Sequence, residues 1–142
     1  MLAKAFKGAE RRMGLQEWQN LKIVVVDDQE EVRSAIDRYL SSLGAQVHTY
    51  ENVGRALDAF LAVQPDLVIC YIHMPPEDGI ALLHRIRSLE QGSRREVPVI
   101  GMTTYANEIE QVKTIEPGFS GFLRKPFTPD ALLRIISDLL KL

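Results

Sequence analysis

Five polar side chains lie at the ends of short apolar runs in this sequence. Asp27 and Asp28 follow the first run, Tyr71 ends the third, and Thr103 and Lys125 follow the fourth and fifth. Two adjacent carboxylates can hold a hard cation such as Mg²⁺, whereas a lysine and a threonine hydroxyl suit the oxygens of a phosphoryl group. Each signal is weak alone, because an acidic pair or a threonine after a strand often only begins a helix. The ordered set predicts one pocket for phosphoryl or metal chemistry.

The elements that must position these side chains alternate between short apolar runs and helical patterns. The apolar runs are continuous and rich in β-branched residues, as in strands that are buried on both faces. Expected strands cover 21–26, 45–50, 66–71, 97–102 and 121–124, and expected helices cover 30–43, 53–64, 80–89, 107–116 and 129–139. This alternation predicts an α/β fold with a parallel sheet between two layers of helices. Ligands bind beyond the carboxyl ends of such strands, so the five side chains should converge.

The composition indicates one globular domain without stabilising cross-links. The chain has 142 residues, of which 46% are hydrophobic and 25% are charged, as is usual for a single domain. The only cysteine, Cys70, can form neither an internal disulfide nor a cysteine zinc site, which favours a cytoplasmic location. The net charge of -2 argues against nucleic-acid binding through bulk charge. The sequence contains neither a membrane-spanning apolar run nor a signal peptide, so we expect a soluble protein that binds no membrane.

Residues 1–20 differ in character from the remainder. They carry the basic residues Lys4, Lys7, Arg11 and Arg12 against only Glu10 and Glu17. Apolar residues recur at helical spacing at Leu2, Ala5, Phe6, Ala9 and Met13. The pattern predicts an amphipathic helical extension that meets the domain at Trp18. A frayed tail, docking onto a partner and docking onto the domain itself all remain open.

Four stretches, in order and at matching spacing, resemble the receiver domain of bacterial two-component response regulators. They read VVVDDQEEVR, PDLVICYIHMPPEDG, PVIGMTT and GFLRKPF, and the resemblance covers residues 21–142. It implies a flavodoxin-like, CheY-like (βα)5 fold whose sheet has the strand order 2-1-3-4-5.

The resemblance also implies roles for individual positions. In that family an aspartate at the end of the third strand accepts a phosphoryl group from a histidine kinase, and this position is Tyr71 here. The acidic pair is Asp27 and Asp28, which would hold Mg²⁺ together with the acceptor and the backbone carbonyl of His73. The hydroxyl switch residue is Thr103, the phosphate-pairing lysine is Lys125, and the aromatic switch residue is Phe122.

Tyr71 departs from the family pattern at the nucleophile itself. A carboxylate is an anion at neutral pH, whereas a phenol, with a reference pKa of about 10, is almost wholly protonated. A phosphorylated tyrosine would also be a stable aryl ester, without the labile acyl phosphate of a receiver. The substitution therefore removes the nucleophile and one metal ligand, and it predicts a poor phosphoacceptor.

Two neighbouring positions are also unusual. Thr104 stands where the family has a smaller residue that leaves room for phosphodonors. The imidazole of His73 lies beside the acidic pocket and could titrate or join a metal site, although a bystander in an exposed loop is the more common situation. Phe122 in place of tyrosine is within the normal range of the family.

These observations lead to a pseudo-receiver as the main hypothesis, that is, a non-enzymatic receiver that signals through protein contacts without aspartate phosphorylation. Two alternatives remain: phosphorylation of a substitute residue, and sensing of a metal or small ligand at the modified pocket. The pocket requires no cofactor, and Mg²⁺ binding would be weak. A dehalogenase-type phosphotransferase is disfavoured, because its Asp-x-Asp motif is replaced by Asp27-Asp28-Gln29.

The resemblance places the partner surface on the fourth helix, the fifth strand and the last helix. Its partner would be a histidine kinase, a regulator, an effector or a second copy of the chain. Apolar residues in the last helix cover a wider arc than one sheet-facing stripe needs. Leu133 and Leu140 are the expected interface residues, while packing of the other apolar residues against the core is the simpler interpretation. Nothing follows Leu142 in this sequence, so we expect output through contacts.

Overall fold

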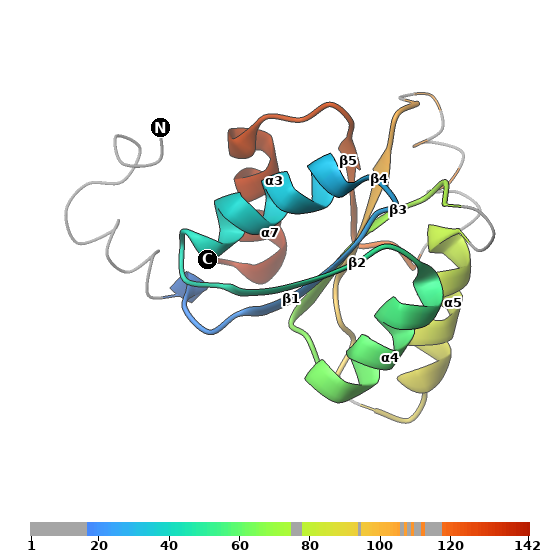
Figure 1. Cartoon of the computed structure of the whole chain (residues 1–142). Helices are drawn as coiled ribbons and strands as arrows, with labels where there is room; N and C mark the ends of the chain where they lie inside the picture. The colour runs from blue at the N-terminus through green and yellow to red at the C-terminus, as the bar shows by residue number, and fades with distance from the viewer. Residues whose placement is uncertain are drawn as a thin grey trace.

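A computed structural model describes residues 17–74, 78–93, 95–105, 107, 109, 112 and 118–142. Its five strands form one parallel sheet in the order β2-β1-β3-β4-β5 (Figure 1). The strands are β1 (Lys22–Val26), β2 (Gln46–Tyr50), β3 (Leu67–Tyr71), β4 (Val99–Thr103) and β5 (Gly121–Arg124). The expected order 2-1-3-4-5 is therefore confirmed, and the strand bounds lie within two residues of the expected ones.

Helices cover both faces of this sheet. α3 (Glu30–Ser41) and α7 (Pro129–Leu140) lie on one face, and α4 (Val53–Val63) and α5 (Gly79–Leu89) lie on the other (Figure 1). This arrangement follows from right-handed crossovers between parallel strands. Of the expected helix at 107–116, the structure describes only residues 107, 109 and 112, which are helical as expected. The expected helix in 1–16 lies outside the described residues.

Local capping chemistry sets where these helices begin. The side chains of Asn52, Asp78 and Thr128 each accept a hydrogen bond from a backbone N–H in the first turn of α4, α5 and α7. Pro129 stands at the start of α7, where its missing N–H is not needed. Gly44 has a φ of 101°, as expected for a left-handed residue after a helix, and the expected helix 30–43 ends at Ser41.

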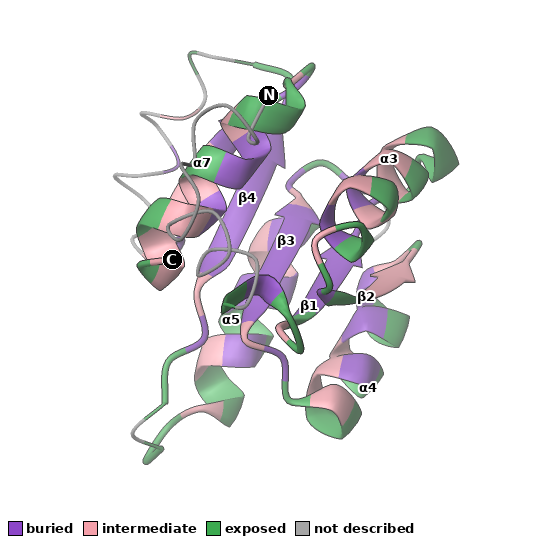
Figure 2. Cartoon of the chain, turned by 90° about the vertical axis from the view of Figure 1, so that its left-hand side faces the viewer, coloured by how far each residue is buried: buried purple, intermediate pink, exposed green. Residues whose placement is uncertain are grey.

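Two hydrophobic clusters lie on the two sides of the sheet. The central strands β1, β3 and β4 are almost wholly buried (Figure 2). Alternate side chains of these strands pack toward α4 and α5 or toward α3 and α7. Tyr71 is half-buried and contacts both clusters. The carboxyl end of β3 is thus packed against the core on both sides of the sheet.

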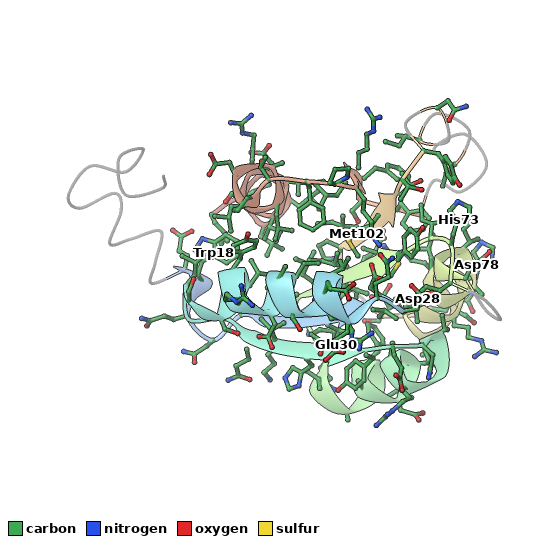
Figure 3. All side chains as sticks on the ribbon, turned by 45° about the horizontal axis from the view of Figure 1, so that its top comes forward. Trp18, Asp28, Glu30, His73, Asp78 and Met102 are labelled. Atoms are coloured by element: carbon green, nitrogen blue, oxygen red, sulfur yellow. The ribbon has the colours of Figure 1, made fainter. Side chains whose placement is uncertain are left out.

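The last residues of the predicted extension pack against the domain. Trp18 is only 4% exposed and joins the cluster beneath α3 and α7. The Asn20 N–H donates to the Gly44 carbonyl at 3.2 Å, which ties this turn to the end of α3. Trp18 lies at the end of the molecule opposite Asp28 and His73 (Figure 3). The expected contact of Trp18 with the domain is confirmed.

Most of the apolar residues of α7 are packed against the core. Leu133 is buried in the cluster shared with α3, so the expectation that it forms an exposed interface is wrong. Helical periodicity identified the apolar face of α7, and Leu133 belongs to the part of that face that is buried in the core. Leu140 is half-buried. Within the described ranges, none of the helices combines the length and apolar content that crossing a bilayer requires.

Candidate functional site

The carboxyl ends of four strands bring the predicted side chains together. Lys125, directly after β5, approaches Asp27, directly after β1, with 2.6 Å between Nζ and Oδ2. The same Nζ lies 3.5 Å from the centroid of the Tyr71 ring at the end of β3. The Lys125 backbone N–H donates to the Thr103 carbonyl at 2.7 Å, which holds the end of β5 against β4. The side chains of Asp27, Tyr71 and Lys125 are therefore brought together as expected, and Thr103 is held beside them through its backbone.

Asp27 and Lys125 form a buried ion pair. The side chain of Asp27 is fully buried and that of Lys125 is 8% exposed. The Gln29 N–H donates to Asp27 Oδ1 at 2.9 Å, and Lys125 Nζ donates to Gln29 Oε1 at 3.4 Å. Arg33 donates from α3 to the Asp27 carbonyl at 2.7 Å. Each charge of the pair is thus compensated by the other and held in place by α3 and the loop before it.

Burial raises the pKa of Asp27 above its ordinary value. Lys125 and the Gln29 N–H act in the opposite direction because they stabilise the charged carboxylate, and the charge of Asp28 adds to the rise. The net direction means that the ion pair offsets the loss of hydration only in part. Lys125 is therefore needed to keep the charged form of Asp27 in the core.

The Tyr71 ring points into the pocket and lies against the Lys125 ammonium. Such a cation over the face of an aromatic ring is attracted by the ring quadrupole. Tyr71 also contacts His73 edge-on, with 6.2 Å between ring centroids, and His73 contacts Tyr105 in the same way at 5.9 Å. These three rings extend from the buried lysine to the surface, where Tyr105 is 59% exposed.

The remaining predicted residues border this pocket. Thr103 is fully buried, and its hydroxyl oxygen accepts a hydrogen bond from the Tyr105 N–H at 3.1 Å. Phe122 is half-buried in β5 and packs against Phe119, with 5.3 Å between ring centroids. Asp28, His73 and Thr104 are exposed around the pocket.

Sequence reasoning missed three residues that shape the site. Gln29 contacts both members of the ion pair, Arg33 holds the loop of Asp27, and Tyr105 ends the row of rings. Gln29 could have been noticed because it directly follows the acidic pair. The sequence does not indicate a role for Tyr105, because its contact with His73 depends on how two loops meet.

The residues of the pocket fit a divalent metal poorly. A Mg²⁺ site uses several oxygen ligands, and carboxylates supply the charge. Here Asp27 is already bound to Lys125 and Gln29, and the side chain at the end of β3, Tyr71, carries a phenol and no carboxylate. In the described part of the chain, no three side chains of His, Cys, Asp or Glu are grouped closely enough to hold a metal ion. The described residues of the pocket are therefore poorly suited to hold a divalent metal ion.

Comparison with known proteins identifies this arrangement. The chain matches the family model of the response regulator receiver domain over residues 23–137. It belongs to the response regulator receiver family. The receiver family comprises signalling modules of two-component systems, and the five-stranded fold and the position of the pocket agree with that membership.

Several relatives support the assignment to the receiver family. The chain is 32% identical over 124 residues to an uncharacterized 14.6 kDa protein of Leptolyngbya boryana, covering 87% of this chain and 93% of that protein. It is 35% identical to the regulatory protein AtoC of Escherichia coli over 85% of this chain, and 32% identical to the transcriptional regulatory protein YxdJ of Bacillus subtilis over 82%. The receiver spans 25% of AtoC and 49% of YxdJ.

Solved receiver structures superpose on the whole domain. The receiver domain of NtrX from Brucella abortus has a TM-score of 0.74 at 30% identity, covering 84% of this chain and 98% of that one. The chemotaxis response regulator CheY4 of Vibrio cholerae has a TM-score of 0.76 at 25% identity, covering 85% and 99%. The fold of this receiver is thus similar over nearly its full length to those of known response regulators.

Proposed function

We propose that this receiver is a pseudo-receiver, which signals by binding a protein partner and is not switched by aspartate phosphorylation. The observation that carries the proposal is the position of Tyr71. Its ring lies at the end of β3 against the Lys125 ammonium, where the resemblance to receivers places the acceptor aspartate. The pocket therefore keeps the lysine and the buried acid but has no carboxylate nucleophile beside them.

The chemistry of Tyr71 supports this proposal. An aspartate attacks phosphorus as an anion, whereas a neutral phenol is a poor nucleophile unless a neighbouring base removes its proton. Asp27, the buried acid of the pocket, is bound to Lys125 and Gln29 rather than to the phenol. Among the described residues of the pocket, Asp27 is therefore not available as the base that would activate the hydroxyl.

The environment of the Lys125 charge also supports the pseudo-receiver proposal. In a conventional receiver this ammonium would pair with the phosphoryl group, according to the family resemblance. Here it is neutralised by Asp27 at 2.6 Å and covered by the Tyr71 ring at 3.5 Å. A phosphoryl group would have to displace both contacts, so the observed arrangement favours one fixed conformation.

Phosphorylation by a small donor tests the proposal directly. The full chain and the variant Tyr71→Asp are each incubated with acetyl phosphate and Mg²⁺, and their intact masses are measured. We expect no added phosphoryl group on the unmodified chain, because it has no nucleophile. We expect a labile phosphoryl adduct on Tyr71→Asp if the rest of the pocket is competent.

Tyr71→Asn is the matched control, since it has nearly the same shape as Tyr71→Asp but no carboxylate. Circular dichroism of the variants shows whether they fold. The unmodified chain decides the proposal even if both variants fail to fold. A phosphoryl adduct on that chain would overturn the pseudo-receiver and support a substitute acceptor, which peptide mapping would then locate.

We also propose that output occurs through contacts with a histidine kinase, a regulator or effector, or a second copy of the chain. The candidate surface includes β5 and the half-buried Leu140 at the end of α7. Sedimentation velocity shows whether the partner is a second copy of the chain. A concentration-dependent dimer that Leu140→Asp abolishes would support a homodimer, whereas a monomer at all concentrations would leave the heterologous partners.

Metal sensing is the weaker alternative, and we propose that Mg²⁺ binds weakly and is not required. Only Asp27 and Asp28 remain as carboxylates of the implied site, and Asp27 is held by Lys125. Thermal unfolding with and without millimolar Mg²⁺, Mn²⁺ or Zn²⁺ tests this alternative, because a ligand that binds the folded state raises Tm. A rise of several degrees that Asp28→Asn abolishes would contradict the proposal.

A further inference from the structure

A groove of about 380 Å³ runs beside α3 on the side that faces the loop after β5. Its apolar lining comes from Val32, Ala35 and Tyr39 of α3 and from Pro126 and Phe127 of the loop. In the described structure these side chains have no element packed over them from outside. An apolar groove of this size is suited to the side chains of an amphipathic helix.

The chain enters the described structure at the far end of the same helix. Trp18 is buried near the end of α3, where the Asn20 N–H also bonds the Gly44 carbonyl. Figure 3 places Trp18 at one end of the molecule and Asp28 at the other, with α3 between them. The preceding sixteen residues are therefore tethered at one end of the α3 groove by a fixed anchor.

The tethered segment is long enough to run the whole length of α3. Residues 1–16 would span about 24 Å as a helix, at about 1.5 Å per residue. The twelve residues of α3 span about 18 Å by the same measure. A helix that runs back along α3 from Trp18 can thus reach the level of Gln29 without any further linker.

The sequence of residues 1–16 also fits the groove in polarity and charge. Its apolar positions share one side of the predicted helix and include Leu2, Phe6, Ala9 and Met13. Its four basic residues, with Glu10 as the one acidic residue, give it a net charge of +3. The end of the groove that is farthest from Trp18 carries the exposed acids Asp28, Glu30 and Glu31.

We propose that residues 1–16 of this chain bind as an amphipathic helix in the α3 groove of the same molecule. The apolar side covers Val32, Ala35 and Tyr39, and Lys4 and Lys7 lie near the acidic end of α3. The groove shares Gln29, Thr104 and Lys125 with the pocket of Tyr71. The bound segment therefore covers one side of that pocket, a role that does not depend on whether Tyr71 can be phosphorylated.

Disulfide cross-linking in the full chain tests this proposal. Ala9→Cys is combined with Ala35→Cys, which lies in the groove, or with Ser34→Cys, which is exposed on the other side of α3. Both positions on α3 are about equally far along the chain from Trp18, so the tether alone does not favour either. The native Cys70 does not interfere, because it is fully buried and burial raises its pKa to about 12.

We expect the Ala9–Ala35 pair to form an intramolecular disulfide at least tenfold faster than the Ala9–Ser34 pair, at a rate independent of protein concentration. Phe6→Asp should slow this reaction about tenfold. Gly8→Asp, which makes the same charge change on the other side of the predicted helix, should leave the rate unchanged. Equal rates for the two pairs would overturn the proposal, and so would exclusively intermolecular disulfides, which would identify a second copy as the occupant of the groove.

Discussion

The ammonium group of Lys125 lies over the face of the Tyr71 ring, 3.5 Å from its centroid. This contact joins the last residue of β3 to the lysine that follows β5. Because Lys125 also binds Asp27 at 2.6 Å, the buried charges of the pocket are balanced without a phosphate. Each of these contacts can be measured separately by substitution.

The ring of Tyr71, rather than its hydroxyl, is expected to stabilise the pocket. Tyr71→Phe keeps an aromatic face beneath Lys125 and should change the free energy of unfolding by less than about 0.5 kcal/mol. Tyr71→Leu keeps apolar volume but loses that face, and it should cost about 1 kcal/mol more. Urea denaturation of the two variants measures the difference, and equal costs would show that the cation–ring contact contributes nothing.

Removing Lys125 should make stability strongly dependent on pH. In Lys125→Met the carboxylate of Asp27 loses its partner, so its pKa rises further above the already raised value. At pH 4 a larger share of Asp27 is neutral in both proteins than at pH 7.5, so the loss of stability is smaller. Near pH 7.5 the folded variant must hold an unpaired carboxylate or take up a proton, and we expect a loss of about 3 kcal/mol.

Urea unfolding of Lys125→Met at these two pH values provides the measurement. The double variant Asp27→Asn/Lys125→Met has no buried acid at this position, so its stability relative to the unmodified chain should depend less on pH. A deficit of Lys125→Met that stays constant between pH 4 and pH 7.5 would show that the buried ion pair is not its cause.

Gly79 is expected to tolerate no side chain. A Cβ at this first residue of α5 would lie 2.6 Å from the Tyr71 carbonyl oxygen and 3.1 Å from Cys70 Sγ. Gly79→Ala should therefore cost about 1 to 3 kcal/mol of stability. Gly54→Ala, early in α4, meets only the Asn52 side chain at 3.6 Å and should be neutral or stabilising. If thermal unfolding gave the two variants the same Tm, the close approach at Gly79 would be excluded as a constraint.

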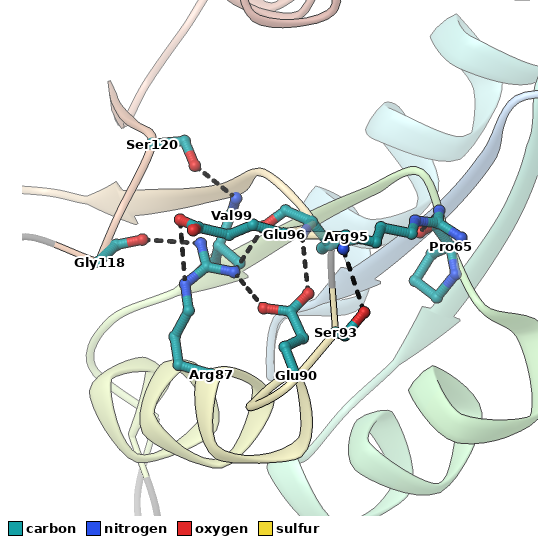
Figure 4. Close-up of polar contacts among 10 residues, drawn as sticks. Pro65, Arg87, Glu90, Ser93, Arg95, Glu96, Val99, Gly118 and Ser120 are labelled. Carbon is teal, nitrogen blue, oxygen red and sulfur yellow. Dashed lines mark hydrogen bonds and ion pairs between the residues drawn. The ribbon is translucent and has the colours of Figure 1, made fainter.

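Arg87 should contribute strongly to stability, because its side chain is mostly buried and makes several polar contacts. It donates to the carbonyls of Val97 and Gly118 at 2.7 and 2.8 Å and pairs with Glu90 at 2.8 Å (Figure 4). Glu90 in turn accepts from the Val97 N–H at 2.7 Å. Arg87→Met leaves these partly buried groups without partners and should cost about 2 kcal/mol.

The matched control for Arg87 is Arg55→Met. Arg55 pairs with Glu51 at 3.6 Å, and both side chains are more than half exposed. Such surface pairs contribute about 0 to 1 kcal/mol, so Arg55→Met should lie near the unmodified chain in urea denaturation. Equal costs for the two substitutions would show that the Arg87 contacts do not hold α5 to the segment before β5.

The features that were predictable from the sequence are those set by local chemistry. Asn52 and Thr128 cap helices because their side chains bond the backbone three residues on, and the apolar runs form strands because both sheet faces are covered. The ends of strands could be placed only within about two residues, as at β4, which ends at Thr103 rather than before it. Hydrogen bonding between neighbouring strands, which decides such ends, is not visible in one strand's sequence.

The contacts within the site depended on side-chain directions that no periodicity encodes. The sequence placed Tyr71 and Lys125 at strand ends on the same edge of the sheet, but it could not show that the ring would turn inward beneath the ammonium. The expectation for Leu133 was wrong for a related reason. Its position in the helical pattern does not tell how far the core extends around that side of α7.

Tyr71 contacts the hydrophobic clusters on both sides of the sheet, so a substitution at this position has two effects at once. An aspartate here would add a carboxylate to the pocket, but it would also remove an aromatic ring on which both helical layers pack. One residue thus couples the chemistry of the pocket to the stability of the core, and a gain in the first is opposed by a loss in the second.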